Sequence, residues 1–377
     1  MKILHAADLH LGKKLFNVDR IDEQTAVMRQ IIDIARENKA DLAVIAGDIF
    51  DTALPSAAAE TLFFESMAEL GRICAVVVIA GNHDDPVRLS AAKEMALACN
   101  IVLAGDQNIT YASKKFQAGN GYIKTEINGQ KVCLNILPYP SDSRLGEAIE
   151  ENTTYPERVK KKLFEGAKGF EQDSVNITVS HLFCAGGVKE GDEREIELGG
   201  ARLIPLDAFP PAHYTALGHV HKPQTMSKSR NIYYSGSIMP YAFEETAQKS
   251  VILADIDSKG VREIQRVPLT KYKPVAKLKA ENIMHALELL DANQDKWVWL
   301  ELNALDSLSD SDTKRIKAFS NLVRFSLNLP EREKIILKDK RQKSDREIFV
   351  EFYKSQYGGS EPSGELVNLF LEIMNEL

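Results

Sequence analysis

Five short apolar segments in the first part of the chain each end in polar or glycine residues. They are rich in Ile, Val, Leu and Ala, which is typical of buried strands, and they comprise Lys2–Ala7, Asp41–Ala46, Cys74–Ala80, Asn176–Ser180 and Tyr214–Leu217. Between the first three segments lie Ile21–Asn38 and Ser56–Leu70, in which apolar residues recur at helical spacing. This alternation predicts an α/β fold built on a mainly parallel sheet.

Two hairpins are expected later in the chain. Asn128-Gly129 separates Gly121–Glu126 from Lys131–Leu137, and a polar turn ending in Gly260 separates Val251–Asp255 from Val261–Val267. An Asn-Gly pair between apolar runs is a strong hairpin signal, because both residues tolerate positive φ. These segments therefore predict antiparallel strands added to the parallel ones.

A second unit is expected past Pro268, since strand and helix patterns alternate again there. The expected elements are a strand at Val275–Lys279, a helix at Asn282–Leu290, a strand at Trp297–Leu302, a helix near Asp312–Phe319 and a strand at Leu322–Leu327. The chain is thus predicted to have three parts: residues 1–268, a small α+β domain at 269–338, and a tail at 339–377.

The tail predicts two helices, at Lys340–Tyr357 and Ser363–Glu376, separated by a loop rich in glycine. Both carry apolar stripes, formed by Phe349, Phe352 and Tyr353 on the first and by Leu366, Leu369, Phe370 and Met374 on the second. Two interpretations stay open: the stripes fold back on the protein itself, or they dock on a partner.

Composition places the chain among ordinary globular proteins. Its 377 residues are 44% hydrophobic, and 47 Lys and Arg stand against 54 Asp and Glu, which gives a net charge of −7. No global attraction to nucleic acid follows from that charge, so DNA binding would need a local basic patch, bound metal ions or a partner.

The four cysteines, Cys74, Cys99, Cys133 and Cys184, contain no C-x-x-C pair, which argues against a disulfide framework and a structural zinc site. The N-terminal segment is interrupted by His5, Asp8 and His10, so no signal peptide is expected, and no apolar run is long enough to span a membrane. We therefore expect a cytoplasmic protein with no membrane association.

Each of the five strand-like segments ends in side chains that can bind a metal ion. These are Asp8 and His10, then Asp48, then Asn82 and His83, then His181, then His219 and His221. In an open α/β sheet, ligands bind at the carboxyl ends of the strands, so the five endings point to one place. A single such motif is a weak signal, whereas their combination in this order is a strong one.

The types of donor atom limit which metal ions and which substrates the site can be expected to bind. Imidazole, carboxylate and amide donors without thiolate favour Mn²⁺, Fe or Zn²⁺, and we expect two Mn²⁺ ions. Two divalent ions bring four positive charges, of which Asp8 and Asp48 neutralise two, so the site would attract an anionic ester. Phosphate esters are anionic esters of this kind. In two-metal sites that act on phosphate esters, the ions lie about 3.5–4 Å apart, and we expect that spacing here.

The motifs that carry these residues resemble those of the calcineurin-like metallophosphoesterases: Asp8-x-His10, Gly47-Asp48-x-x-Asp51, Gly81-Asn82-His83-Asp84, His181 and Gly218-His219-x-His221. Longer stretches resemble the SbcD family of bacterial nuclease subunits: His5–Gly12, Gly47–Thr52, His181–Phe183 with Gly186-Gly187, Ala216–Lys222 and Tyr234–Ser237. The resemblance covers nearly the whole chain and is weakest between Thr270 and Lys340. It implies a metallophosphoesterase sheet sandwich flanked by helices, with a small α+β capping domain and a C-terminal helical tail.

The resemblance also implies roles for the site residues. Asp8, His10 and His221 would hold one ion, Asn82, His181 and His219 the other, and Asp48 would bridge them. His83 would be the catalytic residue, stabilising the transition state or protonating the leaving oxygen. Archaeal and eukaryotic relatives carry a second catalytic histidine where this chain has Asp51.

The activity implied is metal-dependent DNA cleavage, by a 3′–5′ exonuclease on double-strand ends and an endonuclease on single strands and hairpins. It would be driven by ATP turnover in an SbcC partner and would serve DNA repair, recombination and replication. The implied assembly is a homodimer within a heterotetramer with SbcC. The tail would dock on the SbcC coiled coil, and helices near Ser56–Leu70 and Arg88–Cys99 would form the dimer interface.

Two other functions are compatible with parts of this pattern. The first is a calcineurin-like phosphoesterase acting on a phosphoprotein, nucleotide or small phosphoester, although the Gly47 motif does not continue into the Asp-Arg-Gly pattern expected of protein phosphatases. The second is a scaffold whose metal ions only support structure, which the complete ligand set disfavours.

Three cations on the ligand-bearing loops, Lys13, Arg88 and Lys222, are candidates for contacts with DNA phosphates, with solvated loop charge as the alternative. His5, inside the first strand, is expected to serve packing or hydrogen bonding rather than chemistry. Cys184 lies close to His181 in sequence, but the nitrogen and oxygen donor set is complete without it.

Overall fold

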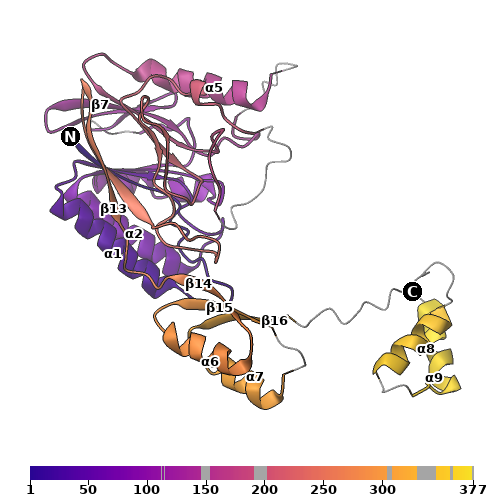
Figure 1. The fold of residues 1–377 in the computed structure, drawn as a ribbon. Helices are drawn as coiled ribbons and strands as arrows, with labels where there is room; N and C mark the ends of the chain where they lie inside the picture. Colours follow the sequence, from indigo (N-terminus) through magenta and orange to yellow (C-terminus); the bar gives the residue numbers. More distant parts are fainter. Residues whose placement is uncertain are drawn as a thin grey trace. The chain divides into compact units, whose positions relative to one another are not determined.

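The computed structural model describes residues 1–111, 113, 115–145, 153–190, 202–303, 308–328, 345–356 and 360–375. The chain divides into two compact units, residues 1–302 with 309–327 and residues 303–308 with 328–377. Two β-sheets stack in the larger unit, with helices on their outer faces (Figure 1). The predicted α/β sheet sandwich is thereby confirmed.

The first sheet has six strands in the order β13-β12-β1-β2-β3-β4. The strands are β1 (Lys2–Ala6), β2 (Leu42–Ala46), β3 (Ala75–Ile79), β4 (Ile101–Ala104), β12 (Ser250–Asp257) and β13 (Gly260–Pro268). The first four run parallel, and β12 pairs antiparallel with both β1 and β13, as the second predicted hairpin requires.

The second sheet has seven strands in the order β10-β11-β9-β8-β7-β6-β5. They are β5 (Gln117–Gly119), β6 (Tyr122–Ile127), β7 (Gln130–Leu137), β8 (Val175–His181), β9 (Tyr214–Gly218), β10 (Gln224–Ser227) and β11 (Ile232–Tyr234). β7, β8, β9 and β11 run parallel. The five ligand-bearing strands are therefore divided, with β1, β2 and β3 in the first sheet and β8 and β9 in the second.

Alternation along the strands produces separate cores. In β1, Ile3 faces the second sheet and Leu4 faces the helices, because successive side chains of a strand point to opposite sides. The core between the sheets is apolar and includes Val44, Val77, Leu134, Ile177 and Val179. Full burial of each such side chain contributes roughly 1.5–3 kcal/mol, so this layer holds the two sheets, and hence their ligand loops, together.

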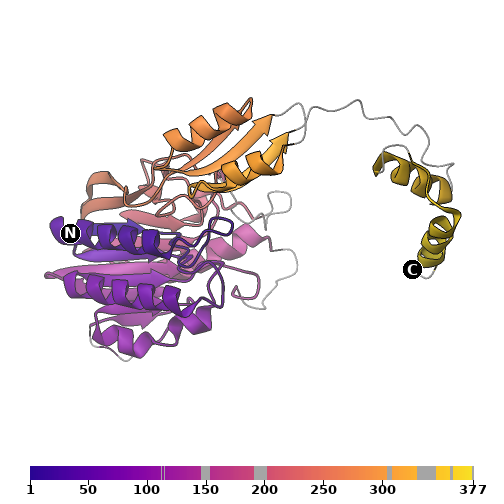
Figure 2. The ribbon, with the colours of Figure 1, turned by 90° about the horizontal axis from the view of Figure 1, so that it is seen from below.

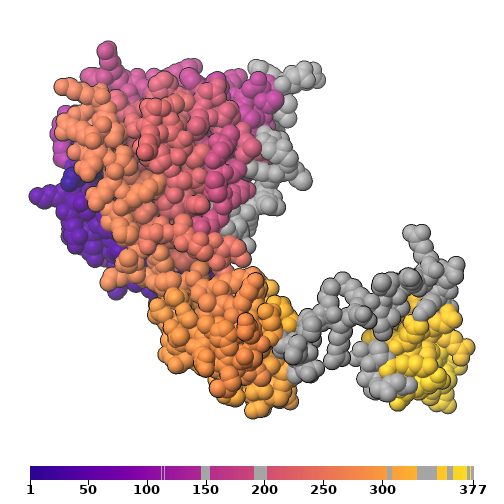
Figure 3. Space-filling model, viewed as in Figure 1, coloured from indigo at the N-terminus to yellow at the C-terminus, as the bar shows by residue number. Residues whose placement is uncertain are grey.

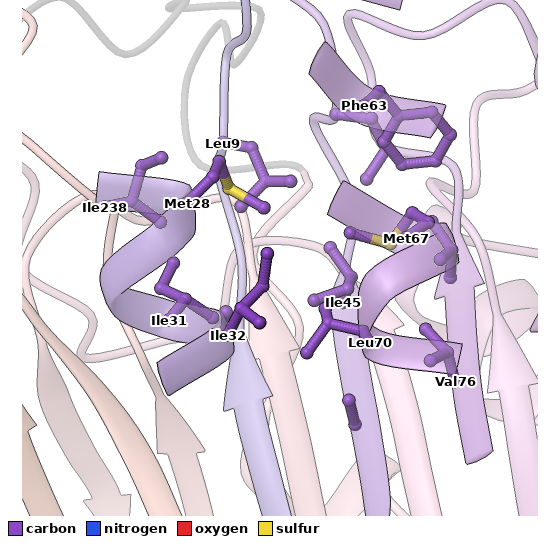
Figure 4. Close-up of a cluster of buried hydrophobic side chains, with 14 of the residues drawn as sticks. Leu9, Met28, Ile31, Ile32, Ile45, Phe63, Met67, Leu70, Val76 and Ile238 are labelled. Atoms are coloured by element: carbon purple, nitrogen blue, oxygen red, sulfur yellow. The ribbon is translucent and has the colours of Figure 1, made fainter. Parts of the chain in front are cut away.

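Helices α1 (Ile21–Glu37) and α2 (Ala57–Ile73) lie side by side on the outer face of the first sheet (Figure 2). Their apolar faces meet the sheet in a cluster that includes Leu9, Met28, Ile31, Ile32, Ile45, Phe63, Met67, Leu70, Val76 and Ile238 (Figure 4). Leu9 lies between two candidate ligands in the sequence, so its burial in this core anchors their loop. Short helices α3 (Pro86–Ser90) and α4 (Lys93–Ala98) follow β3, and α5 (Tyr155–Gly166) covers the second sheet.

A small α+β subdomain follows β13 within the same unit. It consists of β14 (Val275–Ala280), α6 (Ile283–Ala292), β15 (Trp297–Asn303), α7 (Asp310–Lys317) and β16 (Leu322–Asn328), as the sequence pattern predicts. Glu23 on α1 accepts hydrogen bonds from the Lys273 amide (2.6 Å) and the Trp297 indole (2.8 Å). The subdomain thus lies directly against the body of the unit (Figure 3).

The smaller unit contains α8 (Asp345–Gln356) and α9 (Gly364–Asn375). Their rings pack together, since Phe349 and Phe370 are stacked with centroids 4.2 Å apart. The predicted boundary at residue 338 lies outside the described residues and stays a prediction. In the part of the chain described here, no helix is both long and apolar enough to cross a membrane.

Candidate metal centre

The seven predicted ligands converge where the carboxyl ends of the two sheets meet. Asp8 and His10 follow β1, Asp48 follows β2, Asn82 follows β3, His181 ends β8, and His219 and His221 follow β9. Backbone hydrogen bonds join the first two loops, because the Asp8 amide donates to Gly47 O and the His10 amide donates to Asp48 O, both at 3.0 Å. The strand pairing therefore continues into the loops that carry the side chains.

Four of these residues have left-handed backbones. The φ angles are 53° at Asp8, 43° at His10, 49° at Asp48 and 102° at His219. Non-glycine residues rarely adopt such angles, and each costs of order 1–3 kcal/mol unless the surroundings hold it in place. Clustering of this strain in one set of loops is typical of a functional site.

The two aspartates join loops from different strands. Asp8 Oδ1 accepts the His219 backbone N–H at 2.9 Å, and Asp48 Oδ1 accepts the His83 backbone N–H at 2.9 Å. Each carboxylate therefore uses one oxygen to fix a neighbouring loop. Its second oxygen, Oδ2, faces the interior of the site.

Two groups of donor atoms lie on either side of Asp48. On one side, Asp8, His10 and His221 place their donor atoms within 4.8 Å of one another. On the other side, Asn82 Oδ1 lies 3.0 Å from His181 Nε2 and 2.9 Å from His219 Nδ1. Asp48 Oδ2 lies 3.6 Å from His10 Nε2 and 3.4 Å from His181 Nε2, so it is between the two groups.

The arrangement of these donor atoms is better explained by bound divalent cations than by hydrogen bonds among the seven residues. His10 Nε2 and His221 Nε2 lie 3.0 Å apart, and both rings are buried. Asp8 Oδ2 and His10 Nδ1 are buried and have no hydrogen-bond partner among the described residues. Leaving a buried carboxylate oxygen such as Asp8 Oδ2 without a partner is costly. A cation in this group would contact that oxygen and the two imidazole nitrogens that face each other.

The electrostatics of the site lead to the same conclusion. Burial raises the pKa of Asp8, even though His181 and His221 oppose that shift, and burial lowers the pKa of His219 to about 3. Burial would also raise the pKa of Asp48, but the charges of His181 and His10 hold it well below its usual range. The buried carboxylates therefore need positive charge beside them, and divalent ions would supply it.

His83 lies beside the first group, at the edge of the site. Its ring centroid is 4.7 Å from that of His10, and its Nδ1 lies 2.6 Å from the Asp51 carbonyl oxygen. A carbonyl only accepts hydrogen bonds, so Nδ1 carries a proton and donates it to the Asp51 carbonyl. The Asp51 carboxylate lies 3.9 Å from His10 Nδ1 and 3.6 Å from Lys13 Nζ.

The three candidate DNA-contacting cations have different surroundings in the structure. Lys13 faces the Asp51 carboxylate, and Arg88 is paired with Glu60 on α2 at 2.8 Å. Lys222 directly follows the predicted ligand His221 and is partly exposed. The structure brings none of them among the seven donors, and their contact with DNA stays a prediction.

His5 and Cys184 are structural, as the sequence interpretation expected. His5 is buried between the Tyr214 hydroxyl (2.9 Å) and the Leu217 carbonyl (3.1 Å). Burial raises the pKa of the Cys184 thiol to about 12, which keeps it protonated. Neither side chain belongs to a donor group found among the described residues.

Sequence reasoning missed the residues that hold the ligand loops in place. The buried Asp84 carboxylate accepts three backbone N–H groups, from Ile49, Phe50 and Gly81, and so joins the Asp48 loop to the Asn82 loop. Arg144 donates to the carbonyls of Gly81 and Asp84 at 3.1 and 3.0 Å. Asp84 belongs to a motif singled out in the sequence, but Arg144 gives no sequence signal.

A second missed group lies behind His221. Glu245 and Lys249 are buried and in contact with it, although they are 24 and 28 residues away in the sequence. A glutamate and a lysine four residues apart are common on exposed helices, so their spacing in the sequence does not indicate that they are buried behind His221.

Sequence comparisons with known proteins identify the family of the chain. A family model described as calcineurin-like phosphoesterase matches residues 1–223. A relative from Bacillus subtilis (strain 168), the SbcD subunit of the SbcCD nuclease, is 35% identical over 393 residues, which cover 99% of this chain and 97% of that protein. Among solved structures, a dimetal phosphatase from Danio rerio gives a TM-score of 0.41 at 12% identity, covering 72% of this chain and 99% of its own. GAP50, the anchor in the inner membrane complex of Plasmodium, gives 0.40 at 12% identity, covering 82% of this chain and 98% of its own.

Proposed function

The chain belongs to the calcineurin-like phosphoesterases and, among them, to the family of SbcD nuclease subunits, and from this premise we propose that it is a two-metal DNA nuclease. Its reaction class is metal-dependent phosphoester hydrolysis. The observation that carries the proposal is the pair of donor groups sharing Asp48, each completed by residues from both sheets. The proposed activities are 3′–5′ exonuclease on double-strand ends and endonuclease on single strands and hairpins.

Seven residues would hold the ions. Asp8, His10 and His221 would bind one, Asn82, His181 and His219 the other, and Asp48 would be shared by both. When bound, two such ions activate a water molecule and neutralise the charge that develops on the phosphate. We propose Mn²⁺ for both positions, because the mixed imidazole, carboxylate and amide donors suit it.

His83 is proposed to act on the leaving oxygen. The hydrogen bond from its Nδ1 to the Asp51 carbonyl fixes the orientation of the ring, so Nε2 is the atom that would deliver a proton or a hydrogen bond to the substrate. Its backbone N–H is held by Asp48 Oδ1, which ties its position to the residue that would bridge the ions. Asp51 thus contributes to the site through its carbonyl, in the place where other relatives have a histidine.

The relative's name describes it as a subunit of the SbcCD nuclease, and we propose that this chain also assembles with an SbcC-type ATPase and binds DNA with it. In the smaller unit, Ile348, Leu369 and Met374 are exposed, while Val367 is buried. These apolar residues support docking of α8 and α9 on the SbcC coiled coil. If a chain ending before residue 345 still co-purified with SbcC, that docking assignment would be wrong.

A homodimer is proposed through the region of α2 to α4. Four large apolar side chains there are exposed, namely Leu54, Phe64, Val87 and Met95. A contiguous exposed apolar patch marks an interface, so the proposal requires these four side chains to lie on one face. Sedimentation of the wild-type chain beside a Met95→Lys variant tests the assignment, which requires the variant to shift toward monomer.

The test of the nuclease proposal is Mn²⁺-dependent degradation of an end-labelled linear duplex by the full chain, alone and with SbcC and ATP. His83→Ala should reduce the rate by about 10²–10⁴-fold, the usual contribution of a general acid. His285→Ala is the matched control, since His285 is a partly exposed histidine on α6. Turnover of only a simple phosphomonoester would instead support a phosphatase acting on a small phosphoester or phosphoprotein.

A further inference from the structure

A buried charge network lies directly behind His221. Glu245 is 2% exposed and Lys249 is fully buried. Glu245 Oε1 lies 2.9 Å from His221 Nδ1, and Lys249 Nζ donates to Glu245 Oε2 at 2.7 Å and to the His221 carbonyl at 3.0 Å. Ser237 Oγ lies 3.1 Å from Glu245 Oε2. His221 is therefore held both at its ring and at its backbone.

Such a network is costly to bury, and the fold does not need it for cohesion. Removing an ammonium and a carboxylate from water is costly, and their mutual attraction only partly offsets that cost. In other proteins, replacing a buried ion pair by apolar residues of similar volume is often neutral or stabilising, so cohesion alone does not explain the network. The cost is explained if the network controls the neighbouring imidazole.

The geometry shows what that control is. A carboxylate accepts hydrogen bonds, so Glu245 requires the His221 proton to be on Nδ1 and leaves the Nε2 lone pair directed toward Asp8 and His10. A carboxylate behind an imidazole also makes it a stronger electron donor toward a metal. Lys249 holds the carboxylate in this orientation and fixes the backbone from which the ring projects.

The other donor group lacks this device among the described residues. His181 Nδ1 faces the neutral carbonyl of Ala46 at 2.8 Å, and His219 points Nδ1 itself toward Asn82. Among the described residues, the Asp8 carboxylate lies 4.0 Å from His181 Nδ1, beyond hydrogen-bonding distance, and the shared Asp48 lies 3.4 Å from His181 Nε2. The two ion positions are thus chemically unequal.

We propose that Glu245 and Lys249 are positioning residues that make the ion held by Asp8, His10 and His221 the more tightly bound of the two. This inference rests on the proposed two-metal function. It assigns the stronger affinity to the group backed by the buried carboxylate. It also predicts that the two ions load in sequence, with the Asp8 group filled first.

The test is a calorimetric Mn²⁺ titration of the full chain after chelator treatment, with free Mn²⁺ followed by electron paramagnetic resonance. The wild type should show two binding steps of different affinity. Glu245→Gln should weaken the tighter step by about 10–100-fold, the usual effect of removing such a carboxylate. The weaker step should change by less than about threefold.

Two further variants keep the test decisive. Glu23→Gln is the matched control, because Glu23 pairs with buried Arg20 but contacts no ligand, so it should lower the unfolding temperature without changing either affinity. Ser237→Ala removes one hydrogen bond to Glu245 and preserves the charges, so it should weaken the tighter step a few-fold even if Glu245→Gln fails to fold.

The outcomes separate this inference from the nuclease proposal. Equal weakening of both steps, or unchanged binding in folded Glu245→Gln and Ser237→Ala, overturns the inference while DNA cleavage by the wild type stands. Selective weakening in a chain that binds two ions but does not cleave DNA supports the inference and overturns the nuclease proposal.

Discussion

Gly81→Ala should disable the site by a purely steric effect. Gly81 precedes Asn82, and its backbone φ is not positive, so alanine introduces no backbone strain there. A Cβ at this position would lie 2.1 Å from Asp48 Oδ1 and 2.2 Å from the Asp48 amide nitrogen. Non-bonded carbon and oxygen atoms need more than about 3 Å, so the two loops must separate by roughly 1 Å.

The size of the functional loss follows from that displacement. Asp48 is the residue between the two donor groups, and its Oδ1 also holds the His83 amide, so a shift of Asp48 misplaces both ion positions and His83. A misplacement of about 1 Å costs about 100-fold in rate, or about 2.7 kcal/mol in barrier height. Overpacking should lower stability by only about 1–3 kcal/mol, so the variant should still fold.

The assay is Mn²⁺-dependent degradation of an end-labelled duplex, with circular dichroism to establish folding. The control is Gly129→Ala in the β6–β7 turn, where φ is +77° and no described atom lies within 4 Å of the added Cβ. That control should lose about 1–2 kcal/mol of stability from its left-handed backbone and retain wild-type activity. Activity of folded Gly81→Ala within about threefold of wild type would show that the loop spacing does not govern catalysis.

Three further predictions follow from the same contacts. Burial lowers the pKa of His5 to about 3, below its unfolded value of about 6.5, so proton uptake by the unfolded chain should cost the wild type about 2 kcal/mol of stability between about pH 7.5 and pH 5. His5→Gln keeps a donor for the Leu217 carbonyl, so its free energy of unfolding should not fall by this amount between the two pH values. Urea unfolding of both proteins with chelator present measures the difference, and equal losses of stability in the two proteins would contradict the assignment. Chelation of wild-type protein should lower its unfolding temperature by roughly 5 °C relative to Mn²⁺ at about 100 times its dissociation constant, as scanning calorimetry would show, and no shift would count against bound ions. Arg144→Met should release the loop that carries Asn82 and His83 and reduce the cleavage rate about tenfold, with Arg262→Met, at an exposed position on β13, as a control without effect.

Sequence reasoning could predict the fold class and the position of the ligands because both follow from local patterns. The apolar segments ending at Ala7, Ala46 and Ala80 carry polar residues at the point where parallel strands share an edge, and the structure brings those residues together. The local pattern alone does not divide the strands between two sheets, because β8 and β3 are both short segments rich in Val and Ile; only the family resemblance implied a sandwich. Pairing with β7 rather than β4 depends on contacts far apart in the sequence.

The supporting residues were beyond local inference for the same reason. The role of Glu245 depends on its contact with His221, which is 24 residues away in the sequence. The role of Arg144 likewise depends on its hydrogen bond to the Gly81 carbonyl, which no local pattern predicts. The ion pairs of the candidate DNA-contacting cations were also not predictable from the sequence. Arg88 on a ligand-bearing loop is paired with Glu60, a residue that the sequence pattern gave no reason to associate with it.

The strained backbones at Asp8, His10, Asp48 and His219 can be understood from the bonds that the same residues make. Asp8 and Asp48 each accept, through Oδ1, a hydrogen bond from a backbone N–H of another of the site's loops, which ties the loops together. The strain of the four left-handed residues is held by these protein contacts and by the core beneath Leu9. These contacts order the loops that carry the candidate ligands. The donor groups are therefore preorganised, and Oδ2 of each aspartate remains directed at the position an ion would occupy.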